Sequence, residues 1–347
     1  MYLNFEMIGK KERIIPAKTS VRQESGWQQA MANAIRDPAE LLKVLHLDPE
    51  SLPIASLAAT QFSLRVPRGL VAQMRQGDPN DPLLRQVWPR AAETADVSGF
   101  VADPVGDQQA RTAPGVLHKY QGRALLIVTG ACAVHCRYCF RREYPYSDHA
   151  GMDNWQPALA YLKADASIDE IILSGGDPLS LSNQRLSVLL AQLAVIPHLQ
   201  RLRIHTRQPV VLPERVDGEL LTLLMKSRLQ KIIVIHANHP REISAAVSLA
   251  LSRLSSTGAT LLNQSVLLRG VNDCAETLAV LSKVLFTAGV LPYYLHALDR
   301  VRGSAHFEVK EKRASAIMEA LRQRLPGYLV PRFVREQPDQ LSKIPIN

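Results

Sequence analysis

The sequence predicts an α/β fold in which a partial (β/α)6 barrel follows a mainly helical N-terminal region. From Ala124 onward, short β-rich runs alternate with longer helical patterns at intervals of roughly 30 residues, as in parallel βαβ construction. Some runs, such as residues 231–235, are almost wholly apolar, as expected for strands covered on both faces. Six such units suggest a barrel-like sheet that does not fully close. A doubly wound open sheet is the alternative, because periodicity does not separate the two.

Residues 1–115 are expected to form helices and irregular segments rather than a sheet. Residues 37–47 combine an N-cap aspartate, a proline at the first helical position and helical apolar spacing. Shorter helices are expected at residues 65–74 and 81–88. Glycine and proline interrupt residues 97–113, which predicts a connecting loop there.

The remaining chain divides into a barrel region, residues 116–327, and a C-terminal strand and tail, residues 328–347. One further strand is expected within 328–336. The barrel strands are expected at residues 124–128, 170–173, 202–204, 231–235, 260–268 and 293–297. The helices are expected at residues 155–163, 184–195, 213–229, 240–254, 275–288 and 310–325.

Composition narrows the class of protein. The 347 residues are 46% hydrophobic and 21% charged, which is ordinary for a globular protein. The chain contains no apolar run of about 18 residues, and its first residues lack a signal-peptide pattern. Three of its four cysteines are clustered, which argues against a secreted disulfide scaffold. We therefore expect a soluble cytoplasmic protein.

The net charge of +9 is compatible with nucleic acid, an acidic protein or an anionic cofactor as partner. The basic residues are dispersed, without a long Lys/Arg block or interleaved aromatics. We therefore expect neither nucleic acid nor a membrane as partner. An acidic electron-donor protein remains an option.

The cysteine loop carries the strongest chemical signal. Cys132, Cys136 and Cys139 have C-x3-C-x2-C spacing and directly follow the first barrel strand. Three thiolates leave an open position on a zinc ion or on one iron of a [4Fe–4S] cluster. Zinc, with His135 or His149 as fourth ligand, is the alternative. A structural zinc site usually has a second, distant ligand pair, which this sequence lacks, so the spacing favours the cluster.

Polar residues gather where the predicted strands end. Carboxyl ends of parallel strands meet at one edge, where active sites lie in such folds. Each group also has a structural interpretation: Asp177 as the N-cap of a turn, the histidines as satisfied core residues, and Lys343 as a surface charge. Asn263 and Gln264 are costly inside an apolar strand unless hydrogen-bonded, so a ligand is a reasonable partner. The groups are Ser174-Gly175-Gly176-Asp177, residues 205–207, residues 236–239, Asn263-Gln264 and Asp299.

From about Phe62 to its C-terminus, the sequence resembles the radical S-adenosylmethionine (SAM) superfamily and, within it, the lysine 2,3-aminomutase family. The segments that carry the resemblance are residues 136–142, 173–177, 203–213, 236–240, 263–274 and 292–294. The resemblance implies a TIM-like partial barrel of radical SAM type. The short length is most similar to the bacterial members that supply (R)-β-lysine for the modification of elongation factor P.

The resemblance implies that L-α-lysine is converted to (R)-β-lysine with a [4Fe–4S] cluster, SAM and pyridoxal phosphate. The cluster would be held by the three cysteines. Its open iron would bind SAM, whose cleavage gives the radical that takes a hydrogen from lysine. Pyridoxal phosphate would hold lysine as an imine while the nitrogen migrates.

Family roles can be carried over position by position. Lys343 matches the lysine that binds pyridoxal phosphate, and Arg141 matches the residue that binds the substrate carboxylate. Asp299 and Glu336 match the acids that bind the distal ammonium, with Glu336 in place of the family's aspartate. The remaining matches are Arg123 and Lys119 near the cofactor phosphate, and His236, Gln264 and Ser174-Gly175-Gly176-Asp177 near SAM.

Two features depart from the family. Residues 339–342 replace a glycine-rich loop, and the family's zinc-binding C-terminal extension has no counterpart, so no structural zinc is expected at Cys274. The implied partners are an electron donor such as flavodoxin, elongation factor P with its lysyl-transferring ligase, and a second copy in a homo-oligomer. The alternatives are an aminomutase for glutamate or arginine, and a non-catalytic iron–sulfur or zinc protein of redox or RNA-associated function. Lys343 discriminates against the last, because a metal module needs no imine-forming lysine.

Overall fold

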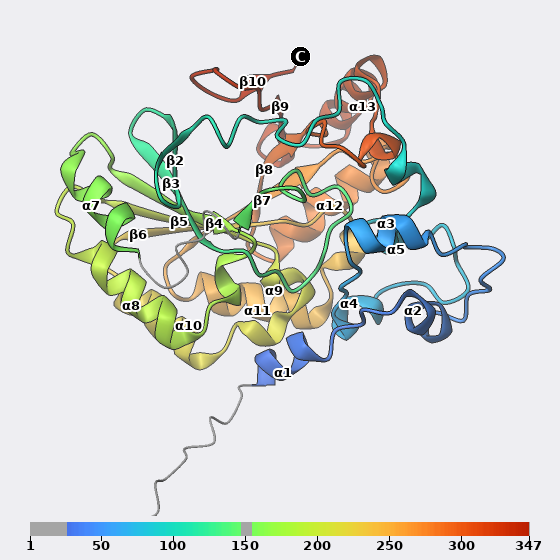
Figure 1. The fold of residues 1–347 in the computed structure, drawn as a ribbon, viewed down its shortest axis with the longest axis horizontal. Helices are drawn as coiled ribbons and strands as arrows, with labels where there is room; N and C mark the ends of the chain where they lie inside the picture. Colours follow the sequence, from blue (N-terminus) through green and yellow to red (C-terminus); the bar gives the residue numbers. More distant parts are fainter. Residues whose placement is uncertain (1–25, 147–154, 347) are drawn as a thin grey trace, which may run out of the picture.

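The structure, a computed structural model, describes residues 26–146 and 155–346, which contain one ten-stranded sheet (Figure 1). The strands lie in the sheet in chain order. They are β1 (Arg111–Ala113), β2 (Val116–Tyr120), β3 (Arg123–Thr129), β4 (Glu170–Gly175), β5 (Arg201–Thr206), β6 (Gln230–Ile235), β7 (Thr260–Val266), β8 (Leu291–His296), β9 (Arg332–Arg335) and β10 (Ile344–Pro345).

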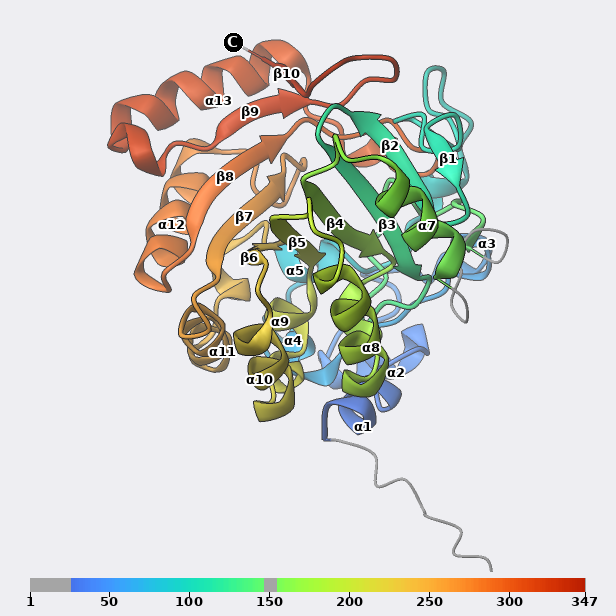
Figure 2. The ribbon, with the colours of Figure 1, turned by 90° about the vertical axis from the view of Figure 1, so that its left-hand side faces the viewer.

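The strand order settles the choice between a barrel and a doubly wound sheet. From β3 to β9 every neighbouring pair is parallel, and the order never reverses as it does at the switch point of a doubly wound sheet. Figure 2 shows the strands curving in an arc, with α8, α10, α11, α12 and α13 along its outer side. Within the described residues the edge strands β1 and β10 do not pair with each other, so the barrel is open. The predicted partial barrel is confirmed.

The six predicted barrel strands and their helices are present. All residues of β4 are buried, as expected for a strand covered on both faces. The region predicted as one helix at 213–229 is instead a short turn followed by α10, because Asp217 caps α10 by accepting from Leu220 N at 2.8 Å. Ser244 splits residues 240–254 in the same way. The helices of this part are α7 (Gln156–Ala164), α8 (Asn183–Ala194), α9 (Gln208–Val211), α10 (Gly218–Lys226), α11 (Ala245–Ser255), α12 (Ala275–Thr287) and α13 (Glu311–Arg324).

The N-terminal region is helical, as predicted, up to its last residues. Asp37 caps α2 by accepting from Ala39 N, and Asp81 caps α5 by accepting from Leu83 N. The prediction of a loop over residues 97–113 is wrong for its last three residues, because Arg111–Ala113 forms β1. This strand pairs with β2, and neither strand was predicted. The helices here are α1 (Gly26–Ala32), α2 (Pro38–Val44), α3 (Ser56–Gln61), α4 (Arg68–Val71), α5 (Pro82–Arg85) and the 3-10 turn η1 (Ala91–Thr94). No described helix is long and apolar enough to cross a membrane.

The C-terminal tail lies beside the last barrel strand. β9 is parallel to β8, and β10 turns back to pair with β9. The predicted strand at 328–336 is shortened to Arg332–Arg335, because the 3-10 turn Gly327–Leu329 precedes it. The pairing of β10 with β9 fixes Lys343, the residue before β10, next to the barrel.

A buried ion cluster joins the N-terminal region to the cysteine loop. Glu93 of η1 accepts from Arg137 Nη2 at 2.6 Å, and both side chains are fully buried. Arg142 Nη2 lies 3.0 Å from the same carboxylate. Arg137 also donates to the backbone oxygens of Phe62 and Ala58. One carboxylate thus pairs with two arginines that flank Cys139 in the sequence.

Replacing Glu93 by glutamine should destabilise the fold, because it leaves two buried guanidinium groups without a counter-charge. We expect a loss of about 3 kcal/mol in the free energy of unfolding, measured by denaturant titration. Glu40→Gln is the matched control, because Glu40 pairs with Arg68 at the surface, where the two side chains are 40% and 56% exposed. Its loss should stay below about 1 kcal/mol. Equal losses in the two variants would contradict the role given to Glu93.

Candidate active site

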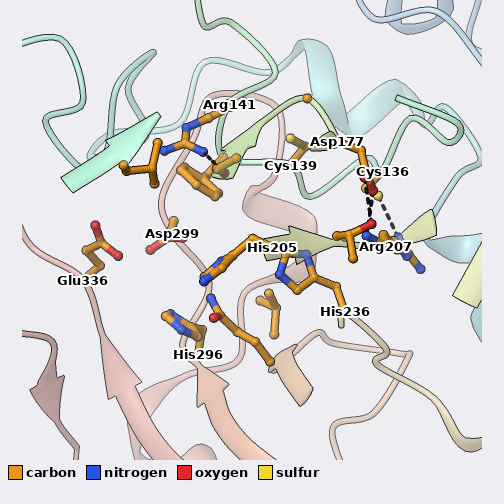
Figure 3. Close-up of a pocket in the computed structure, with 18 of the residues that line it drawn as sticks. Cys136, Cys139, Arg141, Asp177, His205, Arg207, His236, His296, Asp299 and Glu336 are labelled. Atoms are coloured by element: carbon orange, nitrogen blue, oxygen red, sulfur yellow. Dashed lines mark hydrogen bonds between the residues drawn. The ribbon is translucent and has the colours of Figure 1, made fainter. Parts of the chain in front are cut away.

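The open barrel encloses a cavity of about 680 Å³ at the carboxyl ends of its strands. Figure 3 shows Cys136, Cys139 and Arg207 at one end, Asp299 and Glu336 at the other, and His205, His236 and His296 between them. Every residue to which the sequence resemblance assigns a role in the site lines this cavity. They are Lys119, Arg123, Cys132, Cys136, Cys139, Arg141, Ser174, Gly175, Gly176, Asp177, His236, Gln264, Asp299, Glu336 and Lys343.

The cysteine loop is held in place by the Gly175-Gly176-Asp177 segment that follows β4. Gly176 N donates to Thr129 O at 2.7 Å, and Asp177 N donates to Ala131 O at 2.8 Å. A Cβ atom on Gly176 would lie 2.4 Å from Ala131 O, and Gly175 has a φ of +125°. Both positions therefore need glycine, because two backbones meet there. Contact between these glycines and SAM stays a prediction.

Asp177 caps the turn that follows β4, which is the structural role considered for it from the sequence. Its carboxylate accepts from Leu179 N, Thr206 Oγ1, Arg207 N and Gln208 N at 2.7–3.1 Å. Burial raises the pKa of this carboxyl, and the four hydrogen bonds oppose that rise. The side chain thus joins the ends of β4 and β5.

The three cysteines face the cavity without converging on one point. Among the residues that the structure describes, no three or more His, Cys, Asp and Glu side chains are grouped to hold a single metal ion. The thiols are nevertheless close enough to interact: burial, and then the charge of Cys136, raise the pKa of Cys139 to about 11. Three cysteines that face one cavity can each take one iron of a [4Fe–4S] cluster and leave the fourth iron open, and this centre stays a prediction.

The structure describes one of the two histidines considered as a fourth zinc ligand. The His135 ring stacks on Phe62, and its Nδ1 lies 2.8 Å from Ser63 O. His149 lies outside the described residues.

A row of alternating charges lines the opposite wall. Asp107 bridges Arg141 Nε and Lys119 Nζ, each at 2.6 Å. Glu336 bridges Lys119 Nζ at 3.1 Å and Lys343 Nζ at 2.6 Å. Burial would raise the pKa of both carboxyls, but their cationic neighbours outweigh it and hold the pKa of each below its usual value. The residues predicted to bind pyridoxal phosphate and the substrate carboxylate therefore lie in one chain of ion pairs.

Asp107 was missed because it lies in a segment predicted to be a connecting loop. The only signal in the sequence is an acid between glycines and prolines, which is common in exposed loops. Its importance comes from burial: the side chain is 2% exposed and contacts Arg141, which lies 34 residues away in sequence.

Within the described part of the chain, the buried polar atoms of the cavity that have no hydrogen-bond partner include Asp299 Oδ1 and the Nε2 atoms of His205, His236 and His296. Burial, and then the charge of Glu336, raise the pKa of Asp299 to about 7. Burial lowers the pKa of His236 to about 4 and those of His205 and His296 well below their usual value. Unsatisfied buried groups facing one cavity mark a ligand site. His296 was missed; its signal was its place at the end of the last predicted barrel strand.

Two predicted polar groups do not reach the cavity. The Asn263 amide donates to Ala237 O at 3.1 Å and accepts from Ala237 N at 2.9 Å, so the backbone takes the place of the expected ligand. The ring of His239 accepts from Arg241 N and caps a short turn. Gln264, in contrast, faces the cavity.

Comparison with known proteins gives close relatives along nearly the whole chain. L-lysine 2,3-aminomutase of Escherichia coli K12 is 47% identical over 96% of this chain and 97% of its own length. The protein of the same name from Haemophilus influenzae is 46% identical over 93% and 96%. That of Clostridium subterminale is 34% identical over 92% of this chain but 77% of its own length.

No protein-family model matches the chain. A solved radical SAM methyltransferase from Sphaerobacter thermophilus gives a TM-score of 0.42 at 17% identity, over 63% of this chain and 68% of that one.

The pKa of Asp299 predicts a pH-dependent stability. The native carboxyl keeps its proton up to about pH 7, whereas the unfolded chain loses it near 3.8. Native stability therefore falls as pH rises from about 4 to 7, by at most about 4 kcal/mol. Asp299→Asn removes this loss, so the ligand-free variant should exceed the wild type in stability at pH 8 and differ less at pH 5. Denaturant unfolding at both pH values measures this, with the exposed Asp96→Asn as control. A pH-independent difference would show that Asp299 is not buried as a neutral acid.

Proposed function

We propose, from the premise that the chain belongs to the lysine 2,3-aminomutase family of isomerases, that it converts L-α-lysine to (R)-β-lysine. The observation that carries this proposal is the cavity itself. It joins three thiols at one end to a lysine and two carboxyl groups, Asp299 and Glu336, at the other. A substrate with a cation at its far end fits the acidic end, and its carboxylate fits Arg141.

The residues present fit the cofactors that this reaction needs. Cys132, Cys136 and Cys139 would hold the [4Fe–4S] cluster, and Lys343 would bond pyridoxal phosphate. When bound, the cluster, SAM and pyridoxal phosphate supply an electron, a carbon radical and a covalent hold on the substrate nitrogen. The protein supplies binding, orientation and the exclusion of water.

The cofactor phosphate has two candidate partners. Arg123 stacks its guanidinium on Tyr120 at 4.6 Å from the ring centroid and, among residues 26–146 and 155–346, has no carboxylate contact that would compete. Lys119 is held by Asp107 and Glu336, so a phosphate would have to share it with two carboxylates. We therefore assign the larger part of phosphate binding to Arg123.

Glu336 links cofactor binding to substrate binding. In the ligand-free protein its carboxylate is occupied by Lys343, whose ammonium has three hydrogens to donate. With pyridoxal phosphate held on Lys343, Nζ would have fewer hydrogens to donate, so the Glu336 oxygen that faces Lys343 could accept from a new cation while Lys119 keeps the other oxygen. The distal ammonium of lysine supplies that cation, and Asp299 lies across from it with an unpaired oxygen.

The biological setting is part of the same proposal. The chain spans almost the full length of its E. coli and H. influenzae relatives but only about three quarters of the clostridial one. The higher identity to the E. coli and H. influenzae proteins, 47% and 46% against 34% for the clostridial one, supports a place beside those two bacterial proteins, and with it a cytoplasmic role in supplying β-lysine for elongation factor P. A flavodoxin-like donor would provide the electron.

Anaerobic assay of the reconstituted protein with lysine, SAM and a strong reductant should give β-lysine. Lys343→Ala should lose both the product and the absorbance of bound pyridoxal phosphate, because the attachment nitrogen is gone. Cys136→Ala should lose the cluster and the product. Glutamate and arginine serve as competing substrates in the same assay. Product from either of them in place of lysine, or full activity in Cys136→Ala, would refute the proposal.

Glu336→Gln should weaken lysine binding more than it weakens cofactor loading. A hydrogen bond between charged groups contributes about 1.5–3 kcal/mol, so Kd should rise roughly tenfold or more. Binding of lysine and content of pyridoxal phosphate are measured on the same preparation. Glu319→Gln is the control, because Glu319 is 63% exposed on α13. Unchanged lysine affinity would mean that Glu336 does not bind the ammonium.

A further inference from the structure

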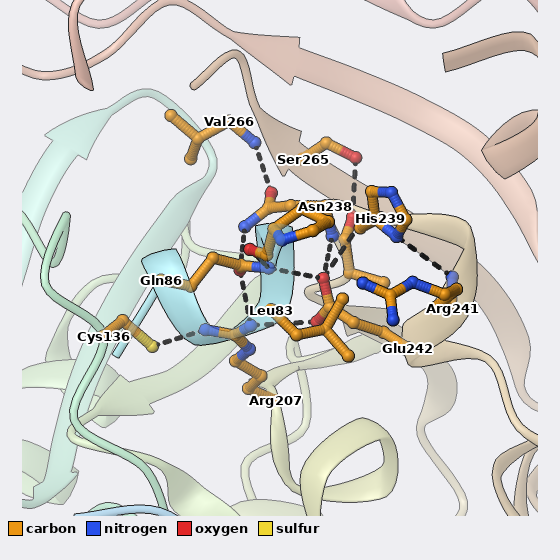
Figure 4. Close-up of polar contacts among 12 residues, drawn as sticks. Leu83, Gln86, Cys136, Arg207, Asn238, His239, Arg241, Glu242, Ser265 and Val266 are labelled. Atoms are coloured by element: carbon orange, nitrogen blue, oxygen red, sulfur yellow. Dashed lines mark hydrogen bonds and ion pairs between the residues drawn. The ribbon is translucent and has the colours of Figure 1, made fainter. Parts of the chain in front are cut away.

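Arg207 directs a buried guanidinium at the cysteine loop from the end of β5 (Figure 4). Its Nη1 donates to Cys136 Sγ at 2.6 Å and to Tyr138 Oη at 2.6 Å. Its backbone N donates to Asp177 Oδ2 at 2.7 Å, and the residue is 6% exposed. Among the described residues, Cys136 is thus the cysteine of the loop for which a hydrogen bond from an arginine side chain is recorded.

The other side of the guanidinium is fixed by two residues from separate parts of the chain. Nη2 donates to Gln86 Oε1 at 2.7 Å and to Glu242 Oε2 at 2.9 Å. Glu242 is fully buried, and its Oε1 accepts from Gln86 Nε2, Asn238 N and His239 N at 2.9–3.1 Å. With both oxygens engaged, Glu242 cannot rotate away, so Arg207 is held in one orientation.

A charged group this close to a cluster ligand changes the reduction potential of the cluster. Hydrogen bonds to the ligand sulfurs and the nearby charge set the reduction potential of an iron–sulfur cluster. A cation donating to the sulfur stabilises the reduced state, which carries one more electron. A buried carboxylate behind that cation has the opposite effect, and burial strengthens both.

We propose that Arg207 is a positioning residue that orients Cys136 and raises the reduction potential of the cluster, while Glu242 limits that rise. The inference rests on the proposed function, because it needs a cluster on Cys136. The residues of this network come from three segments that are distant in sequence: Gln86 follows α5, Arg207 follows β5 and Glu242 follows β6.

The test is the midpoint potential of the cluster in anaerobically reconstituted protein, followed by electron paramagnetic resonance, with iron and sulfide content measured alongside. Arg207→Gln removes the positive charge and should make reduction of the cluster roughly tenfold less favourable. For a one-electron couple, this lowers the midpoint potential by about 59 mV. Arg207→Lys keeps the charge but loses the guanidinium that bonds Cys136 and Glu242 together, so the midpoint potential should shift less than in Arg207→Gln. Glu242→Gln removes the negative charge and should raise the potential.

Arg228→Lys is the control, because the Arg228 guanidinium bonds backbone oxygens of Ala194 and Leu199 and no residue of the cysteine loop. Its potential should match the wild type. Shifts of the same sign in Arg207→Gln and Glu242→Gln, or no shift in either, would overturn the proposal. Loss of the cluster from all three folded variants would also overturn it, by showing a role in cluster retention alone. A wild type that holds a cluster but forms no β-lysine would instead count against the proposed function.

Discussion

The cavity is governed by the cost of burying charge. A charged group inside a protein must be paired, must lose its charge or must await a ligand. All three solutions occur here. Asp107 and Glu336 are paired with cations on both sides, Asp299 keeps its proton to about pH 7, and the neutral histidines have ring nitrogens without partners. Buried polar groups of this kind mark the cavity as a candidate site for polar ligands.

The same constraint explains why a helical N-terminal region accompanies the barrel. This region has no catalytic motif of its own, yet it supplies Gln86 to the network behind Cys136 and Glu93 to the arginines beside Cys139. The loop after β4 contacts the cysteine loop from the other side through Gly176. A cysteine loop fixed from both sides keeps its thiols in place before any cluster binds, which lowers the entropic cost of assembling the centre.

Local signals allowed most of the fold to be predicted from the sequence. The apolar strands and their regular spacing gave the parallel sheet, and N-cap residues such as Asp37 marked helix starts. The strands that were not predicted, β1 and β2, form by pairing between chain segments. They are short, lie on the edge side of the sheet and carry no strong alternating pattern. In the site, the residues that carry family motifs reach one cavity, whereas Asp107 and the contact of Arg207 with Cys136 join positions 34 and 71 apart in sequence. No local pattern records such a contact.

The tail that carries Glu336 and Lys343 shows how the charges can impose an order on binding. In the ligand-free protein Lys343 neutralises Glu336, and Asp299 stays protonated partly because of the charge on Glu336. In the proposed function, a cofactor on Lys343 would weaken the hold of Lys343 on Glu336, which would leave Glu336 and Asp299 facing one space with Lys119 as the remaining cationic partner of Glu336. Two close carboxyl groups cannot both ionise at low cost, so the pair then favours a cationic ligand, and binding of that ligand lowers the pKa of Asp299 in turn. In the proposed function, cofactor attachment at Lys343 and recognition of a distal ammonium would thereby be linked through one carboxylate, and each would strengthen the other by thermodynamic reciprocity.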